Sequence, residues 1–215
     1  ILNTLVFART PIAPIIEEGE TGLTMKQLFS MKIFWILFLM MLSAGASEQA
    51  VSQWSSAFAE QGLGVSKTVG DLAGPMAFAA MMGVSRLIFG KYGEKLNLNR
   101  YMAVCAALCV GAYLCIVFVP SPVLSLLGCA VCGFSVGIFW PGTFSRASAS
   151  IRGGGTQMFA LLALAGDLGC AGGPTLAGLV SGACGGSLRA GILAAIIFPL
   201  LMLLCILLVR KQRGA

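Results

Sequence analysis

Residues 101–119 read YMAVCAALCVGAYLCIVFV, and this stretch contains no charged and no amide side chain. A helix rises about 1.5 Å per residue, so a stretch of this length crosses most of a hydrocarbon core of about 30 Å. A helix that is apolar all round is best placed against lipid. The stretch therefore predicts a membrane-spanning helix at the periphery of a bundle.

Five further apolar stretches surround this one in the chain. The six predicted spans are 31–59, 68–89, 101–119, 122–144, 156–182 and 190–209. Hydrophobic residues make up 58% of the chain and charged residues 10%, which is less than half the charge of an ordinary soluble domain. The sequence predicts an all-α, polytopic membrane protein with six transmembrane helices.

The basic residues orient these spans. Successive gaps between the spans lie on alternating sides of the membrane, and on one side the gaps hold only two basic residues, Lys67 and Arg189. The other twelve share the opposite side: Arg9, Lys26, Lys32, Arg86, Lys91, Lys95, Arg100, Arg146, Arg152, Arg210, Lys211 and Arg213. Lysine and arginine accumulate on the cytoplasmic side of membrane proteins, so we expect both termini on that side. The membrane that we expect is the plasma membrane. Because these bases border membrane spans, the net charge of +6 does not indicate a nucleic-acid partner.

Polar side chains concentrate in the first and fifth spans. The first carries Glu48, Gln49, Gln53 and Trp54 on one side of its helix, and the fifth carries Asp167. An ionised carboxylate at the bilayer centre costs about 2.5 to 3.5 kcal/mol on insertion scales, so it must be protonated, paired or turned toward water. We expect these five residues to bind substrate or proton. A structural hydrogen bond between helices is the alternative for both carboxylates.

The fifth span also carries a small-residue pattern. Gly169 and Gly173 form a small-xxx-small pair, which lets another backbone approach closely, and Pro174 can kink the helix just beyond. Helix packing alone and packing combined with motion both account for this pattern.

The motifs of enzymes are absent or incomplete in this sequence. Gly133-Phe-Ser135-Val-Gly137 matches a nucleophile pattern that requires a strand, a turn and a histidine base, but the chain has no histidine. The eight cysteines lie in or near apolar stretches, where thiols behave as small hydrophobes. No P-loop pattern is present. We therefore expect no enzyme activity, no catalytic residue, no metal and no cofactor.

The gap between the second and third spans reads GKYGEKLNLNR, from Gly90 to Arg100. It resembles the G-x-L-x-D-R-x-G-R-R loop of the major facilitator superfamily, with Gly90 at the first glycine, Glu94 at the acid and Lys95 at the following base. Glutamate replaces the aspartate of that pattern, and Asn97 replaces its second glycine.

The resemblance implies a gating element in the cytoplasmic loop. The acid of such a turn pairs with a base or a helix N-terminus in one conformation only, and Arg146 and Thr156 are the partners we expect for Glu94. The residues predicted to act in gating are Arg86, Gly90, Glu94, Lys95 and Arg146. Of these, Arg86 and Glu94 are expected to contact no substrate.

Six spans with an apolar third and sixth look like one half of a twelve-helix facilitator. Gly45-x-x-Glu48 followed by Trp54 is similar to a pattern in the seventh helix of the fucose-permease-like branch. The segment 9–25 resembles the link between the two halves. The resemblance implies a cytoplasmic linker over 1–27, a C-terminal six-helix half over 28–209 and a basic tail over 210–215. An N-terminal six-helix half outside this chain is then the expected partner.

This resemblance implies secondary active transport of a small solute by alternating access, coupled to protons. Amide and indole groups suit a sugar or polyol, because hydroxyl groups need hydrogen-bond partners. Efflux of a drug or metabolite by the same fold is one alternative, and a non-transporting membrane assembly module is another. The expected partners are the solute, the proton and membrane lipid.

Overall fold

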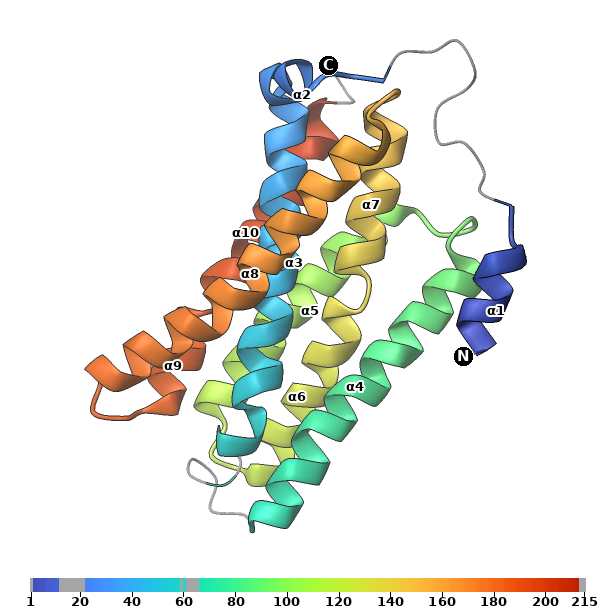
Figure 1. Cartoon of the computed structure of the whole chain (residues 1–215). Coiled ribbons are helices and arrows are strands. Elements are labelled where there is room, and N and C mark those ends of the chain that lie inside the picture. The colour runs from blue at the N-terminus through green and yellow to red at the C-terminus, as the bar shows by residue number, and fades with distance from the viewer. Residues whose placement is uncertain (1, 12–21, 59, 61–65, 213–215) are drawn as a thin grey trace.

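The computed structural model describes residues 2–11, 22–58, 60 and 66–212. In these ranges the chain forms helices and no strand (Figure 1). Two short helices come first, α1 (Leu2–Arg9) and α2 (Met25–Ser30). The bundle follows, with α3 (Lys32–Ala57), α4 (Lys67–Tyr92), α5 (Leu98–Phe118), α6 (Pro122–Val136), α7 (Phe139–Ser150), α8 (Gly155–Ala183), α9 (Leu188–Ala194) and α10 (Ile197–Gln212).

The bundle matches the membrane spans predicted from hydropathy. Five segments of the described chain are long and apolar enough to cross a membrane: Lys32–Ala57, Leu98–Phe118, Val123–Ser150, Gly155–Ala183 and Leu188–Val209. The 26-residue α4 occupies the place of the remaining predicted span. Successive segments run in alternating directions through the bundle in Figure 1. The protein is an all-α polytopic membrane protein, as predicted.

Two spans predicted as continuous, 122–144 and 190–209, are each divided into two helices by a turn. The first turn, at Gly137, separates α6 from α7, and the second, at Ala195, separates α9 from α10. Pro141 and Pro199 follow four residues after these positions. Proline has no N–H to donate to the carbonyl four residues earlier, and its ring clashes with that carbonyl. The hydrogen-bond ladder is therefore interrupted at these turns.

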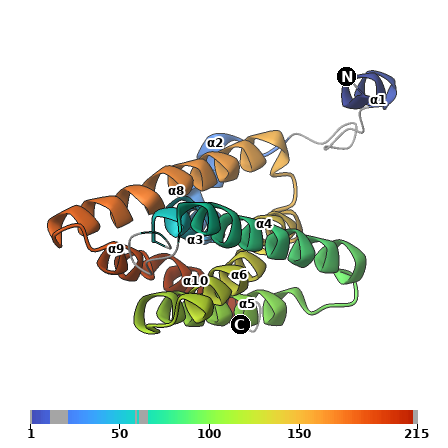
Figure 2. The same cartoon turned by 90° about the horizontal axis from the view of Figure 1, so that it is seen from below.

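The helices form two layers. Seen from below, α8, α3 and α4 lie in one layer, and α10, α5 and α6 lie in the other (Figure 2). Helix α3 is central, because it packs against α8, α10, α4, α7 and α6. The side chains that α5 and α10 expose include Val104, Leu108, Leu204 and Leu207. This agrees with the expected peripheral position of the third and sixth spans; that they face lipid stays a prediction.

Helix α2 begins within the predicted linker and is fixed by local hydrogen bonds. Thr24 and Gln27 form a capping box, in which each side chain bonds the backbone N–H of the other residue. The backbone N–H of Leu23 donates to the carbonyl of Gly153 over 2.8 Å, which ties this segment to the loop before α8. Residues 12–21 of the predicted linker lie outside the described residues.

Glycines set the distance between α3 and α8. Gly169 and Gly173 lie against the backbone of Leu42 and Ala46, and a Cβ atom at either glycine would collide with that backbone. Gly45 meets α8 in the same way from α3. The close approach predicted from the small-xxx-small pair is confirmed. It holds the polar side of α3 next to α8.

Candidate functional site

Glu48 on α3 is the centre of the candidate site. Its side chain is 14% exposed, and its Oε2 atom lies 3.9 Å from Nη2 of Arg86 on α4. Within the described residues, no hydrogen bond reaches this buried Oε2 atom. Glu48 and Arg86 thus form a loose ion pair between two neighbouring helices, without the hydrogen bonds that strengthen a bidentate pair.

The ion pair of Arg86 with Glu48 was not predicted from the sequence. The sequence associated Arg86 with the cytoplasmic loop that follows α4, as a gating residue. In the structure α4 packs beside α3, and the long side chain of Arg86 reaches the carboxylate of Glu48. Arg86 therefore belongs to the same site as Glu48, and its gating role stays a prediction.

An open hollow of about 510 Å³ adjoins Arg86. Its walls come from α4 and α7: Arg86, Phe89, Gly90, Trp140, Pro141 and Phe144. The Arg86 side chain is 49% exposed, and an arginine at membrane depth must pair or turn toward a cavity. The size of the hollow falls in the range of small-molecule sites.

Aromatic side chains continue from this hollow toward α8. The ring centroids of Trp140 and Phe144 lie 6.2 Å apart, and those of Phe144 and Phe159 lie 5.7 Å apart. The Trp140 ring also lies against Gly166 of α8, where a Cβ atom would collide with it. The wall opposite Arg86 is therefore an indole and phenyl surface positioned by contact with α8.

The other polar residues predicted on α3 interact within the chain. Gln53 donates from Nε2 to Oε1 of Gln49 over 3.2 Å, one helical turn away. Trp54 donates from its indole N–H to the carbonyl of Pro174 on α8 over 3.2 Å. Part of the hydrogen-bonding capacity that was expected to bind substrate is therefore used to hold α3 and α8 together.

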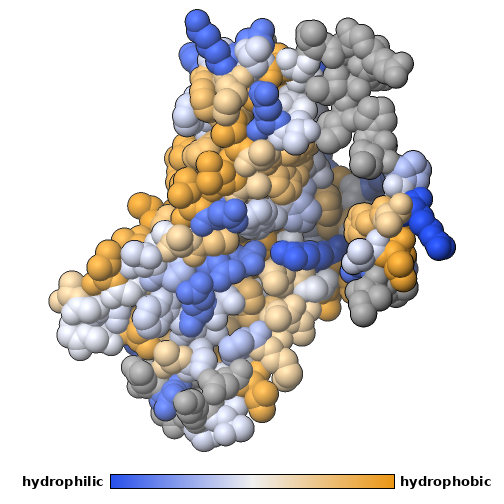
Figure 3. Space-filling view, in the orientation of Figure 1, coloured by the Kyte–Doolittle hydropathy of each residue, from blue (hydrophilic) through white to orange (hydrophobic). Residues whose placement is uncertain are grey.

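Asp167 lies on the exposed side of α8. The thiol of Cys170, one turn further along α8, lies within electrostatic range of both Asp167 and Glu48. Figure 3 shows hydrophilic side chains gathered in the middle of the face formed by α8, α3 and α4. The two carboxylates predicted from the sequence thus both interact with the thiol of Cys170.

The predicted gating pair does not form in this conformation. Glu94 is exposed, in the turn beyond the end of α4, whereas Arg146 is buried within α7. Within the described residues no ion pair joins Glu94 to Arg146, because one lies on the surface and the other inside the bundle. Lys95 is exposed in the same turn, and Gly90 lines the hollow beside Arg86. Their gating roles stay predictions.

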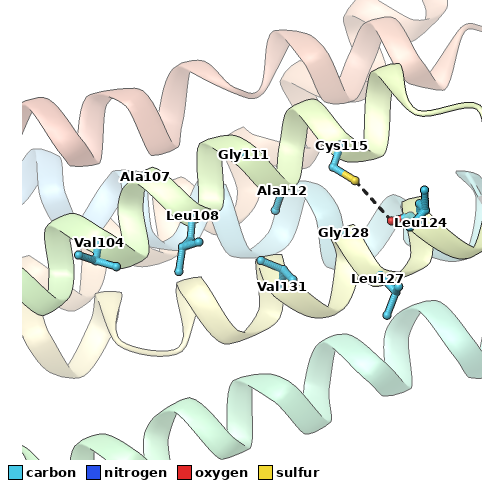
Figure 4. Close-up of a pocket in the computed structure, with 10 residues that line it drawn as sticks. All are labelled: Val104, Ala107, Leu108, Gly111, Ala112, Cys115, Leu124, Leu127, Gly128 and Val131. Carbon is cyan, nitrogen blue, oxygen red and sulfur yellow. Dashed lines mark hydrogen bonds between the residues drawn. The ribbon is translucent and has the colours of Figure 1, made fainter.

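A second groove, of about 490 Å³, lies between α5 and α6 and is apolar (Figure 4). Gly111 and Gly128 are among its lining residues, and Cys115 donates from its thiol to the carbonyl of Leu124 over 3.5 Å. The groove has no charged lining residue. It therefore lacks the polar groups that orient a solute.

The comparison with known families agrees with this geometry. The profile of the Major Facilitator Superfamily matches residues 2–174. The chain belongs to this superfamily. The facilitator is therefore a membrane transporter of a small solute. No curated protein matches the chain.

The functional role predicted for Glu48 stays a prediction, and neither its contact with Arg86 nor the hollow was predicted from the sequence. Arg86 was counted with the cytoplasmic bases, but it falls just inside the end of the predicted span 68–89. That position was the available signal, because a base within a span requires a partner or a cavity. No comparable signal indicated Trp140. Its place in the hollow depends on how α7 packs against α3 and α8 and on where α4 lies relative to α7.

Proposed function

We propose that this facilitator is a secondary active transporter driven by protons, and that Glu48 is its protonation site. The observation that carries this proposal is the loose ion pair between the buried Glu48 on α3 and the half-exposed Arg86 on α4. A buried carboxylate with one distant counter-charge can exist either as the paired anion or as the neutral acid, and the two forms make different contacts.

The ion pair supplies the coupling between protonation and conformation. While Glu48 is ionised, its attraction to Arg86 holds α3 and α4 together on the polar side of the bundle. A proton on Glu48 removes that attraction and releases Arg86. Two conformations that differ in this contact therefore respond to the proton gradient, because the proton binds them with different affinity.

The hydrophilic face of the bundle also indicates where a second half of the transporter would bind. The face formed by α8, α3 and α4 carries hydrophilic side chains in its middle (Figure 3), and such side chains are costly against lipid. We assign this face to the contact with an N-terminal six-helix half, so that the chain is the C-terminal half of a plasma-membrane transporter. The solute path then runs between the two halves, as in other transporters built from repeats.

The geometry bears on the alternatives predicted from the sequence. A sugar or polyol, as in the fucose-permease-like branch, would rely on Gln49, Gln53 and Trp54, and these residues already hydrogen-bond within the chain. Efflux of a more apolar compound suits the aromatic hollow better. A non-transporting assembly module is disfavoured because the chain belongs to a superfamily of transporters, so transport is the function that the family and the site support best.

The test is Glu48→Gln in the full-length protein, reconstituted in liposomes with a pH gradient and assayed with a panel of sugars and drugs. We expect the variant to lose proton-driven accumulation and to retain exchange of labelled for unlabelled solute. Glu60→Gln removes an exposed acid near the end of α3 and serves as the control. Normal accumulation by Glu48→Gln would make Glu48 a structural residue and Asp167 the next candidate.

A further inference from the structure

Arg86 has more hydrogen-bond donors than its contact with Glu48 uses. A guanidinium carries five N–H donors in a planar fork. In the described part of the chain, Arg86 has the ion pair with Glu48 at 3.9 Å and makes no side-chain hydrogen bond. About half of the side chain is exposed, on the wall of the hollow between α4 and α7. Arg86 can therefore accept a second anion without losing an existing hydrogen bond.

The rest of the hollow is apolar. Phe89 and Gly90 form the α4 side next to Arg86, and Trp140, Pro141 and Phe144 form the α7 side. A site with one cation and aromatic walls discriminates between solutes by charge and by shape. A neutral polyol would leave the arginine unmatched and would place hydroxyl groups against aromatic carbon. An anion with an apolar body satisfies both parts of the hollow.

We propose that Arg86 binds the anionic group of an organic anion whose apolar or aromatic body lies between α4 and α7. The proposal rests on the transport function proposed above and names its substrate class. It also replaces the prediction that Arg86 contacts no substrate. Arginine suits this role because its planar fork matches a carboxylate with two parallel hydrogen bonds.

Substrate binding and proton binding are linked in this arrangement, because both act on Arg86. In the described chain, Glu48 interacts electrostatically with Arg86 from α4, Cys132 from α6 and Cys170 from α8, and Asp167 of α8 interacts with the same Cys170 thiol. Arg86 is the one cation among them. A solute anion bound to the free donors of Arg86 shares the charge of the guanidinium with Glu48 and so weakens the attraction on Glu48, which favours uptake of a proton by Glu48. Anion and proton then move together with no net charge.

The first experiment compares each acid with its own amide on the purified, detergent-solubilised full-length protein. The probes are benzoate, phenylacetate and indole-3-acetate, with benzamide, phenylacetamide and indole-3-acetamide as uncharged analogues of nearly the same shape. Binding is measured by titration calorimetry. We expect at least one acid to bind about tenfold or more tightly than its amide, as a charge-assisted hydrogen bond predicts. Equal binding of acid and amide, or binding of neither, overturns the assignment.

The second experiment locates the preference for the acid. Arg86→Gln should abolish the difference between acid and amide, whereas Arg86→Lys should keep part of it, because lysine retains the charge but loses the planar fork. Lys91→Gln is the matched control, since Lys91 is an exposed base at the end of the same helix and lies outside the hollow. A loss of the preference in Lys91→Gln as large as in Arg86→Gln would contradict a local site. If Arg86→Gln does not fold, the anion site is still tested by the Arg86→Lys variant and by the comparison of acid with amide binding on the wild-type protein.

Transport assays separate this proposal from the function on which it rests. Accumulation of a neutral solute under a pH gradient, together with equal binding of acid and amide, would retain proton-coupled transport and reject the anion site. Binding of the acid through Arg86, with no movement of any solute in liposomes, would retain the anion site and reject transport. If the wild-type protein accumulates the acid and not the amide, and Arg86→Gln does not accumulate the acid, both the transport function and the anion site are supported.

Discussion

At the scale of single residues, Tyr113 holds the backbone next to Glu48 through a hydrogen bond. Its side chain is fully buried on α5, and its hydroxyl donates to the carbonyl of Ser47 over 2.9 Å, one residue before Glu48. We expect Tyr113→Phe to lower the free energy of unfolding by about 1 kcal/mol, the net value of one hydrogen bond. Denaturation in detergent measures this, with Tyr92→Phe as the exposed control. An equal effect of both substitutions would contradict the assignment.

The ion pair between Glu48 and Arg86 makes a second prediction at this scale. Arg86→Gln leaves an ionised Glu48 without its counter-charge, and we expect a loss of about 1 kcal/mol near neutral pH, kept small because water screens the half-exposed arginine. The loss should shrink as the pH falls, since a protonated Glu48 needs no counter-charge. Thermal denaturation over a pH series measures both effects. The double variant Glu48→Gln and Arg86→Gln should recover most of the stability; failure to recover would show that the two residues are not coupled.

At the scale of helices, adjacent glycines of α8 have opposite roles. Gly173 lies against the backbone of Ala46 on α3, whereas a Cβ atom at Gly172 would meet no atom within 4 Å. Gly173→Ala should force the two helices apart and destabilise the protein by about 1 to 3 kcal/mol, as overpacking does. Gly172→Ala should be neutral or slightly stabilising, because alanine favours the helix. Melting temperatures of the two variants provide the measurement, and equal values would contradict the close contact.

Helix length was predictable only in part. Spans of apolar residues gave the positions of the long helices, but the turns that separate α6 from α7 and α9 from α10 were not predicted. Proline alone does not explain them, since α4 contains Pro75 and α8 contains Pro174 and both helices continue. Whether a proline interrupts a helix depends on whether neighbouring helices hold the two sides in line. That information lies in the packing and not in the local sequence.

At the scale of the whole molecule, the orientation in the membrane can be tested with a native thiol. Cys184, just beyond α8, is the exposed member of the eight cysteines. The distribution of basic residues places this end of the bundle outside the cell. A membrane-impermeant maleimide should therefore label the full-length protein on intact cells, and Cys184→Ser should lose this label.

The matching cytoplasmic position is Arg152, which is exposed in the loop before α8. With Cys184 replaced by serine, Arg152→Cys should be labelled only after the cells are permeabilised. Labelling of Arg152→Cys on intact cells, or of Cys184 only after permeabilisation, would reverse the topology.

The candidate site shows the same division between sequence and structure. Glu48 was predictable, because an acid in an apolar span is costly wherever the span lies in the bundle. Its partner Arg86 was not, because the contact joins residues that are 38 positions apart and depends on how α4 packs beside α3. The hydrogen bond from Trp54 to the carbonyl of Pro174 could not be predicted from the sequence either, because it depends on the close approach of α8 to α3.

The sequence alone determined that the chain is a helical membrane protein, where its long apolar segments lie and that its polar residues gather in a few of them. These properties follow from the transfer of each side chain between water and lipid, which depends on the residue and its near neighbours. The tertiary structure alone decided which charges meet, which glycines bring backbones together and where a hollow forms. Those properties depend on the relative position of whole helices, and that position results from the packing of all of them at once.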